Sequence, residues 1–196
     1  MRHAPATQRN RDPILAVLQQ ILPPAGFLLE IASGTGEHAA YMAPRLPGWT
    51  WQPSDREPDT QSIDGHSRAA GARNVRPAMR LDVTEPLWPI TSADAILCCN
   101  MIHIAPWTAA EGLFEGAART LTGGGPLVLY GPFRRHGRHT APSNEAFDAN
   151  LRAQDPEWGV RCLDTEVRPL AETHGLECRD VIEMPANNLT VVFRRP

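Results

Sequence analysis

The sequence has few cysteines and spaces none of them as metal ligands. Its four cysteines are Cys98, Cys99, Cys162 and Cys178, and no Cys-x-x-Cys pair or Cys/His ligand spacing occurs. Two of the four are adjacent in an apolar run, which suits buried, reduced thiols. We therefore expect neither a disulfide framework nor a metal site.

Long apolar runs and an excess of one charge are also missing. Residues 1–6 lack the apolar stretch of a signal peptide, and no run approaches the roughly 20 residues that cross a bilayer. The net charge of -3 argues weakly against a nucleic-acid partner, which usually requires a basic face. We expect a cytoplasmic protein whose partner is a small-molecule substrate, not nucleic acid or a membrane. A length of 196 residues predicts a single domain, residues 1–196.

Strand and helix patterns alternate along the chain. A first helix is expected over residues 13–22, with Asp12 as N-cap and Pro13 at its first position. Strands are expected at residues 27–32, 49–55, 75–83, 93–100, 127–133, 176–184 and 189–195. This alternation predicts an α/β, Rossmann-like fold with a seven-stranded, mostly parallel sheet and an antiparallel C-terminal hairpin strand. Residues 134–160 are polar without a clear period, and we expect them to form a lid-like insert.

The segment from Glu30 to Ala39 predicts a nucleotide-cofactor loop between a strand and a helix. Gly34-Thr35-Gly36-Glu37-His38-Ala39 fits the dinucleotide fingerprint, and Asp55 lies about 20 residues on, where a ribose-binding acid belongs. That motif would suit NAD. Three features favour S-adenosylmethionine instead: an acid, Glu30, ahead of the loop; a second acid, Asp82, ending the third strand; and the antiparallel C-terminal pair.

The loop resembles that of class I S-adenosylmethionine-dependent methyltransferases, acid-x-Gly-x-Gly-x-Gly, in the register Glu30 to Gly36. Ala32 replaces the first glycine, and its methyl group narrows the approach to the methionine moiety. The resemblance extends to a methyltransferase-like family that carries a domain-of-unknown-function label. It rests on residues 30–38, 53–55, 81–83, 100–107, 130–133, 143–148, 155–161 and 184–188.

The resemblance implies S-adenosylmethionine as cofactor and a set of residues around it. The residues implied to bind the cofactor are Glu30, Ala32, Gly34, Thr35, Gly36, Asp55, Asp82, Val83 and Asn100. Asp55 would accept hydrogen bonds from the ribose hydroxyls and Asp82 from the adenine amine, with Val83 lending its backbone N–H.

Further candidates follow the later strands, whose carboxyl ends should meet in one place. His103 is the candidate general base and Tyr130 the second catalytic candidate, since imidazole titrates near neutral pH and a tyrosine could orient the reactants. Asn10, Asn144 and Asn187 are the candidates for substrate binding. Cations of the insert, Arg134, Arg135, Arg152 and Arg161 among them, could grip an anionic substrate.

The sequence thus predicts an enzyme that transfers a methyl group to an acceptor at O, N or S. Two alternatives stay open. The glycine loop alone would permit an NAD-binding oxidoreductase, and a methyltransferase-like domain could bind cofactor without turnover and act as an interaction protein.

Overall fold

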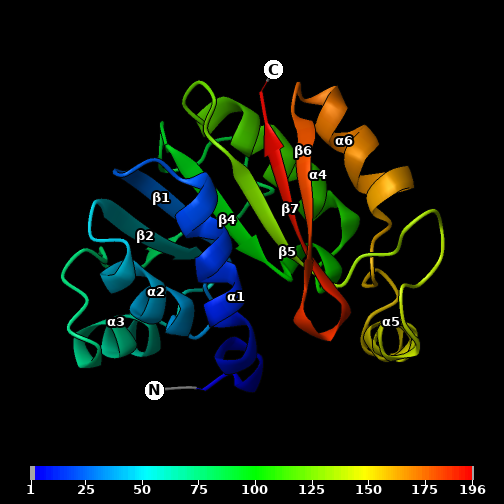
Figure 1. Cartoon of the computed structure of the whole chain (residues 1–196), viewed down its shortest axis with the longest axis horizontal. Helices are drawn as coiled ribbons and strands as arrows, with labels where there is room; N and C mark the ends of the chain where they lie inside the picture. Colours follow the sequence, from blue (N-terminus) through cyan, green and yellow to red (C-terminus); the bar gives the residue numbers. More distant parts are fainter. Residues whose placement is uncertain (1–2, 196) are drawn as a thin grey trace.

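Seven strands form one sheet, of which five run parallel (Figure 1). The computed structural model describes residues 3–195. The strands are β1 (Gly26–Ile31), β2 (Trp49–Asp55), β3 (Met79–Arg80), β4 (Ala95–Cys99), β5 (Leu127–Gly131), β6 (Glu177–Met184) and β7 (Asn188–Arg194). Their order is β3-β2-β1-β4-β5-β7-β6, with β7 antiparallel to both β5 and β6. This topology confirms the expected mostly parallel sheet with an antiparallel C-terminal pair.

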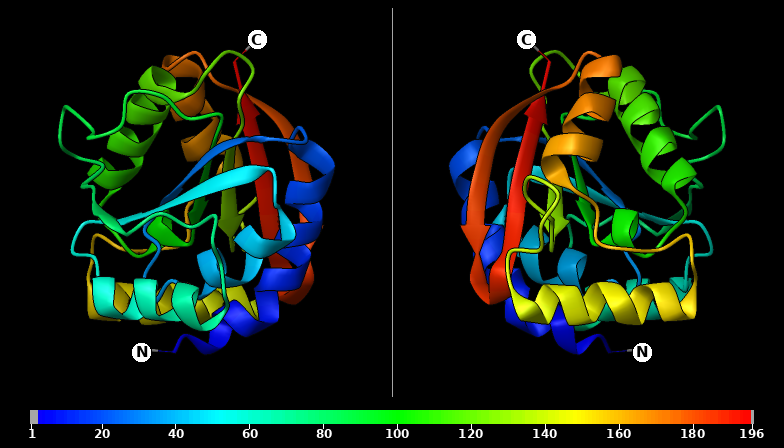
Figure 2. Two further views of the ribbon diagram at one scale, coloured as in Figure 1. Left: turned by 90° about the vertical axis from the view of Figure 1, so that its left-hand side faces the viewer. Right: turned by 90° about the vertical axis from the view of Figure 1, so that its right-hand side faces the viewer.

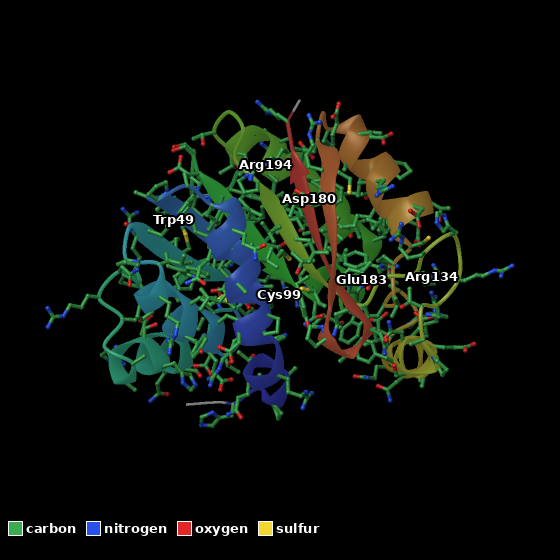
Figure 3. All side chains as sticks on the ribbon, viewed as in Figure 1. Trp49, Cys99, Arg134, Asp180, Glu183 and Arg194 are labelled. Carbon is green, nitrogen blue, oxygen red and sulfur yellow. The ribbon has the colours of Figure 1, made fainter. Side chains whose placement is uncertain are left out.

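Helices cover both faces of the sheet. The α-helices of the described residues are α1 (Pro5–Ile21), α2 (Glu37–Met42), α3 (Thr60–Ala69), α4 (Trp107–Thr120), α5 (Pro142–Gln154) and α6 (Arg168–Thr173). Apolar side chains of α1 and α2 pack on one face, and those of α4 and α6 pack on the other. Figure 2 shows the two layers from either side, and Figure 3 shows the side chains that fill the space between them.

The centre of the sheet is buried on both faces. Leu28 and Leu29 of β1 are fully buried although they point to opposite sides, as a central parallel strand requires. The strand order changes direction at β1. The strands β2 and β3 lie on one side of it, and the next strand in the sequence, β4, lies on the other. Ligands bind at such a switch point, outside the carboxyl ends of the strands.

The first helix begins earlier than expected. We expected residues 13–22 with Asp12 as N-cap, but α1 starts at Pro5, with Ala4 as N-cap, and Pro13 lies inside it. Pro5 satisfies the preference for proline in the first turn, so Pro13 is not the start signal. The N-terminal turns of α1 reach the end of the molecule where the parallel strands finish (Figure 2).

Two other expectations need correction. The third strand was expected at residues 75–83, but β3 covers only Met79–Arg80, because Pro77 has no N–H to donate to a ladder. The insert at 134–160 contains the helix α5, whose buried residues include Asn144, Asp148 and Leu151. Two of these three are polar, which hid the helical period. Figure 2 shows α5 crossing the carboxyl edge of the parallel strands.

Candidate functional site

The loop after β1 turns through backbone conformations that favour glycine. Ala32, Gly34 and Gly36 have φ angles of 57°, 55° and 84°. Gly36 is the N-cap of α2, and a Cβ there would lie 2.5 Å from the Cα of Ile63 on α3. Only glycine meets both conditions at position 36. The alanine at position 32 is held in a left-handed conformation that L-residues adopt at a cost.

Asp55 ends β2 directly beside this loop. One carboxylate oxygen accepts the backbone N–H of Gly34 at 3.0 Å, and the other has a long contact with the N–H of Glu57 at 3.4 Å. The structure therefore brings together the predicted loop and the predicted ribose-binding acid. Asp55 retains acceptor capacity for a ligand hydroxyl, since a carboxylate offers about four lone-pair directions.

Asp82 and Val83 follow β3 at the same edge of the sheet. Burial acts to raise the pKa of Asp82, but hydrogen bonds from Thr84 and the charges of Arg56 and Arg80 outweigh it and lower this pKa below its ordinary value. One oxygen accepts both the N–H and the hydroxyl of Thr84, at 3.0 and 2.7 Å. Val83 is buried beneath it. The carboxylate is held in the charged, acceptor-only form.

Glu30 is buried on the α1 side of β1. It is 2% exposed, and one carboxyl oxygen accepts the indole N–H of Trp51 at 2.9 Å. The other lies 3.9 Å from Nδ1 of His38. Burial raises the pKa of Glu30 to about 7 and lowers the pKa of His38 to about 4. The pair is therefore neutral in weakly acidic solution, with the proton on the carboxyl.

A chain of polar side chains continues from this pair toward β5. Nε2 of His38 lies 2.8 Å from Oδ1 of Asn10 on α1, and Asn10 also hydrogen-bonds the side chain of Tyr130. Burial raises the pKa of Tyr130, so its hydroxyl stays protonated at neutral pH. The structure thus joins Glu30, Asn10 and Tyr130 through His38. The sequence analysis gave no role to His38, whose only signal was its place just after the glycine loop.

His103 has the environment of a structural imidazole. It is fully buried, its Nδ1 accepts the backbone N–H of Arg161 at 3.2 Å, and its ring packs edge-on against Phe133 at 4.9 Å. A Cβ on Gly131 would lie 2.6 Å from its Nε2, which has no hydrogen-bond partner among residues 3–195. Burial, followed by the charge of Arg161, lowers the pKa of His103 to about 3. The expected role as a general base does not fit this geometry, because the ring is enclosed and hard to protonate.

Arg161 holds the insert against the loop that follows β4. Its guanidinium donates to the carbonyl oxygens of Ile102 at 2.9 Å, Ala105 at 2.8 Å and Glu157 at 2.7 Å. Cations are rarely buried unless bonded in this way. Arg161 was expected to be a possible substrate contact. Two of its three partners, Ile102 and Ala105, lie more than fifty positions away in the sequence, so the sequence pattern gives no sign of this structural role.

Acidic side chains pair with three other arginines that were expected to bind substrate. Arg134 pairs with Glu166 at 2.9 Å, Arg135 with Asp164 at 3.0 Å, and Arg152 with Asp148 at 3.1 Å. Figure 3 labels Arg134 at the start of the insert. These pairs weaken the expectation that the three arginines grip an anionic substrate, since each of them already has a carboxylate.

Asn144 and Asn187 connect α5 to the turn between β6 and β7. The side-chain amide of Asn144 donates to Thr140 Oγ1 at 3.0 Å and to the backbone oxygen of Asn187 at 2.9 Å. Ala186 and Asn187 both have φ of 58°, and Asn100 after β4 has φ of 62°. With Ala32, these strained residues gather at the carboxyl edge of the sheet. Strain retained at one edge points to a functional surface there.

Thr35 orients the first residue of α2. Its hydroxyl donates to Oε2 of Glu37 at 3.0 Å, and its backbone oxygen accepts the hydroxyl of Ser62 at 3.1 Å. The same Glu37 oxygen accepts the N–H of Ala4 at 2.7 Å. Ala4, which precedes α1, and Thr35 of the loop after β1 therefore share one carboxylate oxygen.

Three solved structures share this arrangement of elements. Human N-acetylserotonin methyltransferase (ASMT) in complex with SAM has a TM-score of 0.77 and 14% identity, covering 97% of this chain and 52% of its own. The mitomycin 7-O-methyltransferase MmcR has a TM-score of 0.82 and 17% identity, covering 97% and 54%. CalO1, a methyltransferase in calicheamicin biosynthesis, in its SAH-bound form has a TM-score of 0.75 and 15% identity, covering 95% and 54%. The chain spans about half the length of these proteins, and at such identities the likeness shows a common fold.

Over residues 3–195, none of the helices combines the length and the apolar character needed to cross a bilayer. The sequence also matches a family model over nearly its whole length. That model is described as "Protein of unknown function (DUF938)", it matches residues 1–195, and the chain belongs to this family.

Proposed function

We propose that this protein transfers a methyl group from S-adenosylmethionine to a small-molecule acceptor. One observation carries the proposal: Asp55 caps the amide of Gly34 at the switch point between β1 and β4. A carboxylate bonded to the tip of the glycine loop can also reach a ribose beside that loop. The antiparallel pair β6–β7, which a plain dinucleotide fold does not need, favours this cofactor over NAD.

The residues at the loop fit the cofactor. Gly34 carries no Cβ and nothing lies within 4 Å of where one would be, so a ligand can approach the backbone there. Gly34 and Gly36 would pass under its methionine end, with Ala32 and Thr35 flanking them. Asp55 would accept from the ribose hydroxyls and Asp82 from the adenine amine, next to the backbone of Val83. When bound, the cofactor supplies an electrophilic methyl group on a sulfonium.

The chain's own contribution is to position the acceptor. Tyr130 on β5 and Asn10 on α1 present a hydroxyl and a carboxamide that hydrogen-bond to each other. Asn144 and Asn187 hold α5 to the hairpin turn, and Asn100 shapes the end of β4. Holding two reactants in line supplies much of the rate of a group transfer. In this proposal His103 positions the insert through Arg161 and takes no proton.

Calorimetric titration with S-adenosylhomocysteine tests the cofactor assignment. We expect one site in the wild type, with binding lost in Asp55→Ala. Asp55→Asn keeps an acceptor for the Gly34 amide but removes the negative charge. It therefore distinguishes the role of Asp55 in holding the glycine loop from its role in binding the ribose. Asp180→Ala is the matched control, because this exposed acid lies on the outer strand β6 (Figure 3). Its affinity should equal that of the wild type.

The alternatives give different outcomes in the same titrations. Binding of NAD in place of S-adenosylhomocysteine would refute the proposal and favour an oxidoreductase. With cofactor binding established, transfer of labelled methyl from S-adenosylmethionine to a panel of alcohols, amines and thiols tests the chemistry. We expect Tyr130→Phe to lower turnover with cofactor affinity intact. Cofactor binding without transfer to any acceptor, together with a co-purifying partner protein, would favour the interaction protein.

A further inference from the structure

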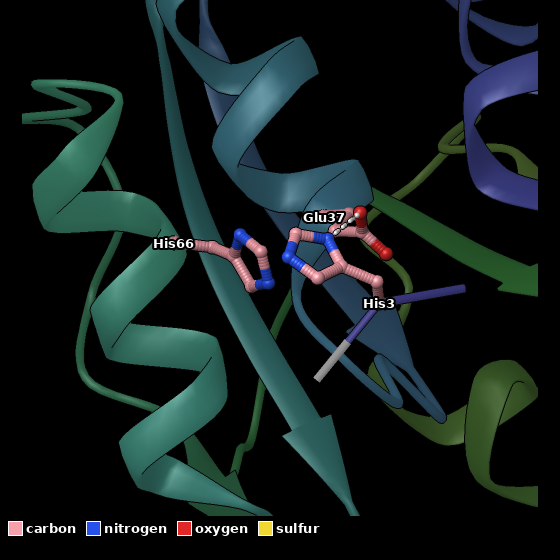
Figure 4. A group of neighbouring side chains, drawn as sticks. All are labelled: His3, Glu37 and His66. Carbon is pink, nitrogen blue, oxygen red and sulfur yellow. Dashed lines mark hydrogen bonds and ion pairs between the residues drawn. The ribbon is translucent and has the colours of Figure 1, made fainter. Parts of the chain in front are cut away.

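Two imidazoles and one carboxylate converge beside the cofactor loop. Figure 4 shows His3, from the segment before α1, between Glu37 at the start of α2 and His66 on α3. Each offers one ligand atom, and these atoms all lie within 4.8 Å of one another. His3 is exposed, whereas Glu37 and His66 are half-buried. Three segments far apart in the sequence therefore present nitrogen and oxygen donors to one accessible point.

The carboxylate of Glu37 is oriented by its neighbours. One oxygen, Oε2, accepts the N–H of Ala4 at 2.7 Å and the hydroxyl of Thr35 at 3.0 Å. The other, Oε1, faces Nδ1 of His3 at 3.1 Å. Burial acts to raise the pKa of Glu37, but hydrogen bonds from Ala4, His3 and Thr35 outweigh it and lower this pKa. Supporting hydrogen bonds of this kind orient the carboxylate ligands of metal sites.

From this geometry we propose that His3, Glu37 and His66 form a zinc site. Two imidazoles and a carboxylate are a ligand set that Zn²⁺ favours, with a fourth position left to water. Bonds of about 2.0–2.1 Å in a tetrahedral site place donors roughly 3.4 Å apart. The three donor atoms now lie at most 4.8 Å apart, so no separation would have to close by more than about 1.4 Å. His3 precedes α1 and is exposed, so it can supply most of this movement.

A bound ion would fasten the residues before α1 to α2 and α3. Thr35 of the cofactor loop touches the same carboxylate, so the ion would also stiffen the loop from outside. No metal site was expected from the spacing of cysteines and histidines along the chain. His3, Glu37 and His66 have no such spacing, and only the fold brings them together. This inference does not depend on the proposed methyl transfer.

Competition for Zn²⁺ against a chromophoric chelator tests the site. The protein is the full chain without an affinity tag, freed of metal by a stronger chelator. We expect one equivalent of Zn²⁺ per chain and affinity at least about tenfold weaker in His66→Ala and in Glu37→Gln. Thr35→Val, which removes a bond to Glu37 but no ligand, should weaken binding by about tenfold or less. His136→Ala is the matched control, because His136 is an exposed histidine paired with Asp164 in the insert; it should bind as the wild type does.

Cobalt substitution identifies the donor atoms. We expect the d–d bands of a nitrogen- and oxygen-ligated ion without the thiolate band that a cysteine ligand would add. Circular dichroism of the metal-free variants checks that each is folded. If His66→Ala does not fold, His3→Ala, which removes an exposed side chain, replaces it in the titration. Affinity unchanged in the folded variant, or a thiolate band, would overturn the proposal.

Discussion

Replacing Glu30 with glutamine should change how the stability of the protein depends on pH. The pKa of Glu30 is raised from 4.5 to about 7, first by burial. The folded chain binds this proton more tightly than the unfolded chain, so the contribution of Glu30 is complete below pH 4.5 and is lost as pH rises through 7. At about 1.4 kcal/mol per pKa unit, the loss is about 3 kcal/mol.

His38 contributes the opposite dependence. Its pKa is lowered from 6.5 to about 4, first by burial. Its contribution is complete above pH 6.5 and is lost as pH falls through 4, again by about 3 kcal/mol. Between these limits the folded pair and the unfolded pair bind equal numbers of protons, since folding moves one proton from imidazole to carboxyl. The two slopes therefore largely cancel in the wild type.

Urea unfolding from about pH 4 to 8 separates the two slopes. We expect the free energy of unfolding of Glu30→Gln, relative to the wild type, to rise by about 3 kcal/mol between pH 4.5 and 7. That of His38→Asn should fall by a similar amount between pH 4 and 6.5, and the double variant should show neither change. A difference between Glu30→Gln and the wild type that stays constant with pH would refute the reasoning. It would mean that folded Glu30 is ionised and paired with a protonated His38.

Three further substitutions test the strained and buried positions. Ala32→Gly should stabilise the protein by up to about 1 kcal/mol in urea unfolding, because relief of the left-handed conformation exceeds the entropy that glycine adds to the unfolded chain; destabilisation would contradict this. Asn144→Ala leaves the oxygen of Asn187 without its donor, so amide exchange across α5 should quicken, as a loss of about 1–2 kcal/mol implies; unchanged exchange would count against that tie. His103 should show no NMR titration between about pH 5 and 8, and His103→Ala should cost about 2–4 kcal/mol through a cavity and an orphaned Arg161 N–H; an inflection near 6.5 would restore it as a base.

The sequence was sufficient for the centre of the sheet because β1, β4 and β5 are apolar and the turns beside them are marked by glycine and proline. It was insufficient for α5, whose buried face carries Asn144 and Asp148. A helix that buries amide and carboxylate groups by hydrogen-bonding them shows no apolar period. The predicted start of α1 was wrong at Pro13, because a proline inside a helix and a proline at its first position look the same in the sequence.

The candidate site was predictable where its residues are close in sequence to the strand ends. Gly34 and Asp55 meet as expected, because β1 and β2 are adjacent parallel strands. The environment of His103 could not be predicted, since it depends on Arg161 reaching across from the insert. The sequence does not distinguish a histidine with a solvated ring from one with an enclosed ring. Packing sets its pKa, and the enclosed ring with a pKa of about 3 argues against the predicted role of general base.

The protonation states of the buried groups bear on the acceptor. His38 and His103, with pKa values of about 4 and 3, are neutral and poor proton acceptors at neutral pH. Glu30 titrates near 7, but its carboxyl is enclosed by Trp51 and His38. A general base works best with a pKa near the operating pH and direct reach to the proton it removes. None of these three groups has both properties. Under the proposed function, this favours acceptors that ionise readily or already carry a free lone pair, such as thiols and amines, over alcohols that need a base.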